Sequence, residues 1–239
     1  MPKKITKKPY GILGETTLSE RNGGEATFTR MAFPDDKAEA ERQIANLFYN
    51  NYQANLIRID LINPPVQNRE DDLDFNINDG GVEKYLELAE IAPSEYMSKG
   101  YRYIPNTYHL YEMAMAVFGE IEKKAKKYTG IGKPIILLLY ITDYRFHFNL
   151  EGTILNLLKY KCFYANFKFD KIIILNPMGD SCTITQIFPQ CTDWPFPFNP
   201  DNIMNNKNAT VWIPDPREIK LSSDDGSLSF NMGTMPPAK

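Results

Sequence analysis

The sequence predicts an α/β domain in which helices pack on a mixed sheet, and two kinds of pattern lead to this fold class. Residues 105–128 carry apolar side chains at helical spacing, whereas residues 135–141 and 171–175 are short apolar runs typical of central strands. In chain order the expected elements are a helix, three strands in a meander, a long helix, a strand, a helix and a strand. This order favours a sheet with both parallel and antiparallel strands.

The first half of the chain supplies a helix and the meander. A helix is expected over residues 35–52, because Pro34-Asp35-Asp36 is a helix-start signal and apolar residues then recur every three to four positions. The first strand of the meander stops at Asn63-Pro64-Pro65, and the second ends at the turn signal Asn78-Asp79-Gly80-Gly81. The alternation of apolar and polar residues places the three strands at 57–61, 72–77 and 83–91.

The second half of the chain builds the rest of the sheet. Gly130 ends the long helix, and the apolar segment 152–163 is expected to form the helix that crosses between the two central strands. Shorter pieces follow at 183–188 and 210–213, on either side of a loop from Trp194 to Pro200 that is rich in proline and aromatic residues. Their order in the fold is left open by the sequence.

A single domain of 239 residues is expected, since this length is ample for one hydrophobic core. The core covers about residues 35–177. A lysine-rich tail precedes it at residues 1–10, and a C-terminal extension follows at 178–239. The last stretch of this extension, from Gly226 onward, is expected to be flexible.

Composition and charge narrow the function classes. A net charge of −3 and a pI of about 5.5 give no global positive field for non-specific binding to nucleic acid or anionic membranes, so a basic patch has to be local. The longest apolar run, 134–141, is far shorter than the roughly 20 residues of a membrane span, and no membrane association is expected. Three cysteines fit a reducing compartment, so a cytoplasmic location is expected.

Acidic residues gather on the second and third strands of the predicted meander. Strand alternation places Asp72, Asp74 and Asn76 together on one face of the second strand. On the third strand, Glu87 lies among apolar neighbours. A carboxylate in such a position is costly unless it is paired, binds a metal or lies at the edge of the sheet.

Asp74 and Glu87 are therefore the candidate metal ligands. Two acids on neighbouring strands within about 4–6 Å of each other repel, so one pKa rises and the pair becomes a site for a hard cation such as Mg²⁺ or Mn²⁺. A cation there lowers the pKa of a water molecule and neutralises negative charge, which is the chemistry of metal-assisted phosphodiester hydrolysis.

The order of elements and these two acids resemble the core of the PD-(D/E)XK, or restriction-endonuclease-like, nuclease superfamily over about residues 35–142. Asp74 stands in the position of the family's Asp, and Glu87 in that of its Asp/Glu. The resemblance implies a three-layer restriction-endonuclease-like fold, a Mg²⁺ or Mn²⁺ cofactor and a DNA or RNA phosphodiester substrate. It also implies an assisting acid on the first helix, for which Glu41 is the candidate because it flanks the apolar face.

The superfamily's lysine is missing, because Ala89 stands two residues after Glu87. Some members of the superfamily supply this lysine from the following helix, and the helix here ends in a lysine-rich segment. At 100° per residue Lys124 falls beside the apolar stripe, whereas Lys123 and Lys126 face solvent. Lys124 is therefore the candidate for a displaced catalytic lysine.

Two other interpretations stay open at this stage. In the first, residues 70–72 form a solvated charged turn and Asp74 is the polar side of an edge strand. In the second, the chain keeps a nuclease-like fold without catalysis and binds nucleic acid or a protein partner through the Lys124/Lys127 helix end and the loop Trp194–Pro200. The active and inactive forms differ in whether a lysine ammonium reaches the two acids.

Overall fold

The computed structural model places most of the chain between Gly11 and Asn231. The residues that it describes are 9, 11–19, 25–55, 57–68, 73–97, 101, 104–105, 107–128, 130–146, 153–189, 210–212, 220–224 and 227–231.

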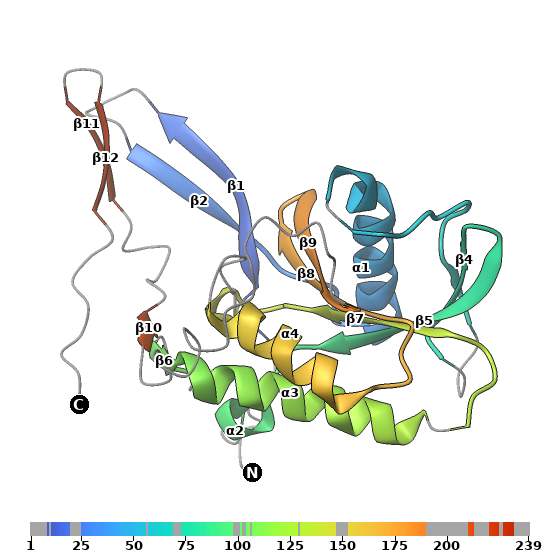
Figure 1. The fold of residues 1–239 in the computed structure, drawn as a ribbon. Coiled ribbons are helices and arrows are strands. Elements are labelled where there is room, and N and C mark those ends of the chain that lie inside the picture. Colours follow the sequence, from blue (N-terminus) through green and yellow to red (C-terminus); the bar gives the residue numbers. More distant parts are fainter. Residues whose placement is uncertain are drawn as a thin grey trace, which may run out of the picture.

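A mixed sheet of six strands lies at the centre of the molecule (Figure 1), which confirms the predicted α/β class. The strand order is β3-β4-β5-β7-β8-β9; β5, β7 and β8 run parallel, and the other neighbouring pairs are antiparallel. The strands are β3 (Val66–Gln67), β4 (Phe75–Asp79), β5 (Val82–Glu90), β7 (Ile135–Tyr140), β8 (Lys171–Met178) and β9 (Ser181–Phe188).

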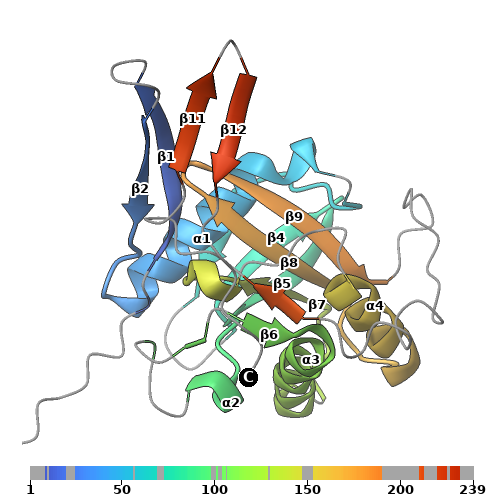
Figure 2. The same cartoon turned by 90° about the vertical axis from the view of Figure 1, so that its left-hand side faces the viewer.

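Helices cover both faces of this sheet (Figure 2). Helix α1 (Lys37–Asn51) packs on one face, and α3 (Leu110–Lys127) and α4 (Thr153–Ala165) pack on the other. Because strand side chains alternate, the buried strand β7 serves both cores: Leu138 packs in the core beneath α1, whereas Leu137 packs in the core beneath α3 and α4. A strand buried on both faces explains the unbroken apolar run in the sequence.

The ends of the helices are fixed by local contacts. Asp36 caps α1, and its carboxylate accepts a hydrogen bond from the backbone N–H of Glu39 at 2.9 Å. Helix α3 begins at Leu110, later than the expected residue 105, because residues 107–109 form the short strand β6 (Thr107–His109) and pair with β10 (Thr210–Trp212). A partner about one hundred residues away in the sequence overrides the local helical pattern.

Two hairpins lie side by side next to the sheet (Figures 1 and 2). One joins β1 (Ile12–Ser19) to β2 (Glu25–Met31), and the other joins β11 (Lys220–Asp224) to β12 (Ser227–Asn231). Residues 227–231, which belong to the stretch expected to be flexible, pair with β11. The remaining short helix is α2 (Ser94–Met97).

The predicted strand at 57–61 was also wrong. Of this segment only Leu61 forms a bridge, to Asp79, and the meander takes β3 as its first strand instead. Segment 57–61 runs past the β4–β5 turn, where the backbone N–H of Asp60 donates to Asp79 Oδ1 at 2.8 Å and the N–H of Gly80 donates to the Asp60 carbonyl at 2.8 Å. Segment 57–61 therefore forms hydrogen bonds to the β4–β5 turn instead of the strand pairing that its alternation of apolar and polar residues predicted.

An ion-pair network closes the sheet at the β4–β5 turn. The ammonium groups of Lys84 and Lys171 both lie 2.7 Å from Asp79 Oδ2, and Lys84 also lies 2.8 Å from Asp170 Oδ2. Burial raises the pKa of Asp79, but hydrogen bonds from Lys171 and Lys84 outweigh it, so the net effect is a lowered pKa. The network ties the first residues of β5 and β8 to the end of β4.

None of the described helices is long and apolar enough to cross a membrane.

We expect Asp79→Asn to lower the free energy of unfolding at pH 7 by about 1–3 kcal/mol, because it leaves two partly buried ammonium groups with Asp170 as their remaining acid. A depressed carboxyl pKa stabilises above the unfolded value of 3.8, so the loss should shrink as the pH falls below that value. Urea unfolding at pH 7 and pH 3 measures both effects. Glu83→Gln, at an exposed position, is the control; an equal effect from both variants would contradict the network's role.

Candidate active site

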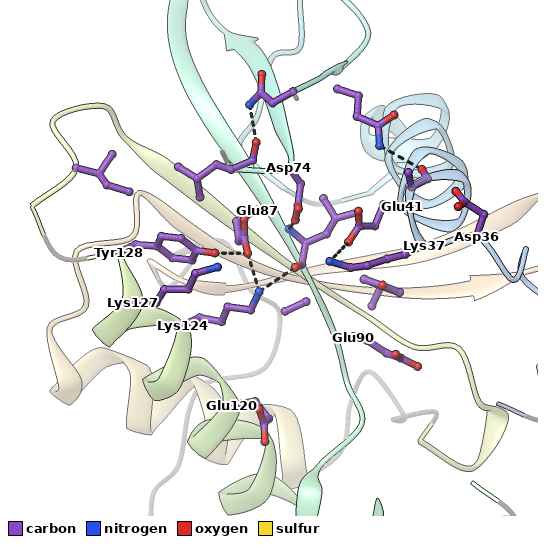
Figure 3. Close-up of a pocket in the computed structure, with 18 residues that line it drawn as sticks. Asp36, Lys37, Glu41, Asp74, Glu87, Glu90, Glu120, Lys124, Lys127 and Tyr128 are labelled. Carbon is purple, nitrogen blue, oxygen red and sulfur yellow. Dashed lines mark hydrogen bonds and ion pairs between the residues drawn. The ribbon is translucent and has the colours of Figure 1, made fainter. Parts of the chain in front are cut away.

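A cavity of about 1010 Å³ opens at one edge of the sheet (Figure 3). It lies between the first turns of α1, the start of β4, the second half of β5 and the last turns of α3. Its ionisable lining residues are Asp36, Lys37, Glu41, Asp74, Glu87, Glu90, Glu120, Lys124, Lys127, Tyr128 and Tyr140.

The cavity exists because β4 and β5 separate. Their ladder runs from the Asp79–Val82 pair to the Phe75–Leu86 pair, and β5 then continues to Glu90 with β7 as its strand neighbour. Asp74 precedes the ladder, and its Oδ2 accepts a hydrogen bond from the backbone N–H of Leu88 at 2.7 Å. The side chain thus takes the place of a strand partner and lies next to Glu87.

Glu87 is 3% exposed, and two groups from α3 and its end hold its carboxylate. The Lys124 ammonium lies 2.6 Å from Glu87 Oε1, and the Tyr128 hydroxyl donates to the same oxygen at 2.5 Å. Lys124 also donates to the Leu88 carbonyl at 3.3 Å. A buried acid is tolerated when it is paired and hydrogen-bonded in this way.

Each of the two acids keeps one oxygen for a ligand. Asp74 is held through Oδ2 and Glu87 through Oε1, whereas Asp74 Oδ1 and Glu87 Oε2 accept no hydrogen bond from the part of the chain that the structure describes. Figure 3 shows the two side chains next to each other in the cavity. The contacts that hold one oxygen orient the other.

Asp74 and Glu87 lie close enough for the charge of one acid to affect the pKa of the other. Burial raises the pKa of Asp74 to about 6, the neighbouring charge of Glu87 adds to this shift, and the hydrogen bond from Leu88 opposes it. Burial, followed by the hydrogen bond to Glu87, raises the pKa of Tyr128, which keeps its hydroxyl protonated as a donor. The site therefore holds an excess of negative charge that a cation would relieve.

Glu41 reaches the same cavity from α1. Its side chain is buried, and its Oε1 lies 3.2 Å from the ammonium of Lys37, one helical turn earlier. The hydrogen bond with Glu41 is the main reason why the pKa of Lys37 is raised, and the charge of Glu41 in turn contributes to the raised pKa of Asp74. Glu41 is thus coupled electrostatically to the pair.

The structure brings together all four residues singled out from the sequence, namely Glu41, Asp74, Glu87 and Lys124. Ala89, which stands where the resemblance predicts a lysine, is buried in the cavity wall, and the ammonium of Lys124 pairs with Glu87.

Sequence reasoning missed three groups in the cavity. Tyr128 follows Lys124 by four residues, and Lys37 precedes Glu41 by four, so helical spacing was the available signal for both. Glu90 had no such signal, because its partners, the hydroxyls of Tyr101 and Thr142, come from separate loops.

The donor set suits a cation that keeps much of its water. Within the described residues, no three His, Cys, Asp or Glu side chains form a metal-ligating group. Mg²⁺ is commonly held by one or two carboxylates, with water or substrate phosphate completing the shell. Asp74 and Glu87, each with one oxygen to offer, fit that pattern.

Several expectations lie outside the described residues. They concern the basic tail at 1–8 and 10, the charged turn at 70–72, and the loop Trp194–Pro200.

No protein-family model, no curated protein and no solved structure matches the chain.

We expect Asp74→Asn to stabilise the protein at pH 8 by about 1–2 kcal/mol, a value reduced for the partial exposure of the side chain. The raised pKa means that the folded state binds more protons than the unfolded state between pH 3.8 and about 6, so ionisation costs the wild type stability as the pH rises through this window. Asparagine still accepts the Leu88 hydrogen bond.

The test is urea unfolding of both proteins at pH 4 and pH 8, with Glu83→Gln as a control at an exposed acid. The gain should approach zero at pH 4. A gain of the same size at both pH values would show that the charge of Asp74 is not the cause.

Proposed function

We propose that this chain is a metal-dependent, nuclease-like protein that hydrolyses nucleic-acid phosphodiesters. The observation that carries the proposal is the pairing at the fork of β4 and β5: two adjacent acids each keep one oxygen without a donor from the described chain, and a lysine ammonium lies 2.6 Å from one of them. Two acids that can hold a cation, together with a lysine ammonium beside them, suit the hydrolysis of a phosphodiester.

Asp74 and Glu87 are the residues that would hold Mg²⁺ or Mn²⁺. When bound, the cation lowers the pKa of a water molecule and neutralises charge on the phosphate. The raised pKa of Asp74 supports this assignment, because a nearby cation would offset the repulsion from Glu87.

Three further side chains of the cavity have separate roles in the proposed reaction. Lys124 supplies positive charge beside the pair, where negative charge grows on a phosphate oxygen during hydrolysis. Tyr128 fixes the orientation of Glu87 through its hydroxyl. Glu41 lies on the α1 side of the cavity and assists by its charge, which acts on Asp74.

The arrangement of elements supports a restriction-endonuclease-like topology. Helix α1, the meander β3–β4–β5, α3, β7, α4 and β8 follow one another in the order that the resemblance implies, and the helices lie on both faces of the sheet. The acids lie where the second and third strands of the meander part, which supports assignment to the PD-(D/E)XK superfamily.

One observation favours a second candidate, a catalytically inactive module that binds nucleic acid or a protein. Ala89 occupies the position of the family's lysine, and its small apolar side chain has no charge to offer. In this alternative Lys124 only neutralises Glu87, and the cavity binds without cleaving.

Mn²⁺ at 100 times its dissociation constant should raise the free energy of unfolding at pH 7.5 by about 2.7 kcal/mol, because it binds the folded state alone. Thermal unfolding with and without the metal measures this. Glu87→Gln should abolish the shift, while Glu120→Gln, at the cavity margin, should retain it. An unchanged melting temperature of the wild type over millimolar Mn²⁺ would argue against the metal site.

Cleavage is the direct test. Purified protein with Mg²⁺ or Mn²⁺ should cleave plasmid DNA or single-stranded RNA, and EDTA or Asp74→Ala should stop it. Lys124→Met should lower the rate about 100- to 1000-fold, as loss of a positioned charge does in other active sites. Lys123→Met, one residue away on the exposed face, should leave the rate unchanged.

Absence of cleavage by the wild type with either metal, while metal-dependent stabilisation persists, would favour the binding module. Cleavage that survives Asp74→Ala would point to a contaminating enzyme and refute the assignment.

A further inference from the structure

A second hollow, of about 400 Å³, lies beside the cavity along β3 and β4. Asn76 on β4 pairs with Tyr85 on β5, and Tyr85 lies two residues before Glu87, so the side chains of Asn76 and Glu87 project from the same face of the sheet. Val66 on β3 pairs directly with Asn76, which places both side chains on that face. Side chains that line the hollow therefore lie on the same face of the sheet as Glu87.

Two asparagines connect the hollow to the cavity. Asn68 lines the cavity, Asn76 lines the hollow, and the Asn76 amide donates a hydrogen bond to Asn68 Oδ1. Asn68 is itself fixed, because its amide donates to the carbonyl of Leu73, the residue before Asp74. A ligand bound at Asp74 that extends past this amide pair enters the hollow.

Lys133 supplies a fixed positive charge in the hollow. Its ammonium donates to Asn76 Oδ1 at 2.8 Å and lies 4.4 Å above the ring of Tyr85. Glu83 lies 3.5 Å from it, but the Glu83 side chain is 81% exposed, so solvent screens this pair. Lys133 is thus oriented by the amide and the ring, and a phosphate in the hollow would compete with the exposed Glu83 for its charge.

The remaining lining is apolar and exposed. Val66 is 63% exposed, and Pro64, two residues earlier, is exposed as well. Exposed apolar surface beside amide groups and one cation matches the needs of a nucleotide: the apolar surface accepts the face of a base, the amide of Asn63 or Asn78 pairs with the base edge, and the cation contacts a phosphate. A volume of 400 Å³ lies at the small end of ligand pockets, which run from about 300 to 1000 Å³.

We propose that this hollow is a nucleotide subsite that takes an unpaired base next to the phosphate bound at Asp74 and Glu87. The inference rests on the proposed function and extends it to a substrate class, single-stranded nucleic acid. A base inside a duplex is stacked and paired, so entering the hollow requires it to be unpaired first. Single strands present their bases without that cost.

The test is binding without cleavage. With Ca²⁺ in place of Mg²⁺ or Mn²⁺ as the cation at the acid pair, fluorescence anisotropy with labelled 12-nucleotide single-stranded DNA and RNA, and with the matching duplexes, gives the affinity for each form. We expect the single strand to bind at least about 10-fold more tightly than its duplex. Lys133→Gln should weaken single-strand binding about 5- to 10-fold and reduce the salt dependence by about one charge.

Two matched pairs of variants locate the effect. Val66→Asp places a negative charge at an exposed position in the hollow and should weaken binding about as much as Lys133→Gln. Val82→Asp, at an exposed position that is not part of the hollow's lining, and Lys123→Gln, on the solvent face of α3, should each change the affinity less than 2-fold. Circular dichroism of all four variants checks folding.

The outcomes separate the two proposals. Equal affinity for duplex and single strand, no binding of either, or wild-type affinity in both Lys133→Gln and Val66→Asp would overturn the subsite. Single-strand binding that depends on Lys133 and Val66, in a protein that cleaves nothing with Mn²⁺, would keep the subsite and overturn hydrolysis.

Discussion

The backbone N–H of Leu88 sets the geometry of the site. Where β4 leaves β5, this donor loses its strand partner, and a buried donor without an acceptor costs free energy. The Asp74 carboxylate accepts the bond and is thereby fixed beside Glu87. The hydrogen bond that satisfies this backbone donor therefore brings two acids together, and the negative charge of the cavity follows from that contact.

The second half of the site depends on the core beneath α3. Val117 and Ile121 are buried against the sheet, and this packing fixes the rotation of the helix about its axis. The same rotation directs Lys124, one turn later, toward Glu87 rather than into solvent. Apolar burial on α3 and ion pairing in the cavity therefore support each other.

Most elements of the fold follow from local sequence patterns. The segments that depart from these patterns do so for identifiable physical reasons. The central strands and the three long helices follow from periodicity, since their apolar patterns match the faces that they bury. The segment 57–61 alternates like a strand but bonds to the β4–β5 turn through Asp60, and residues 107–109 leave the helix to pair with β10. Both departures depend on partners distant in sequence, which a local pattern does not contain.

The residues of the site could be predicted from the sequence to a similar extent. Strand alternation identified Asp74 and Glu87, because that rule states which face a side chain occupies. Glu41 and Lys124 came from the resemblance to the nuclease superfamily, which implies an acid on the first helix and a displaced lysine, and helical spacing then selected the residue. The separation of β4 from β5 could not be predicted from the sequence, since it depends on where the ladder of hydrogen bonds between the two strands stops. Glu90 was missed because its two hydroxyl partners come from loops without a periodic pattern.

The lysine that contacts Glu87 lies in the last turn of its helix. Tyr128 is the C-cap of α3, and its backbone N–H bonds to the Lys124 carbonyl at 3.3 Å, so one final turn carries both groups that contact Glu87. Helix ends fray at far lower free energy than global unfolding. Opening of this single turn would release the ammonium and the phenol together, and Glu87 would lose both groups that contact its carboxylate. The positive charge beside the acid pair and the donor that orients Glu87 are therefore gained or lost as one unit.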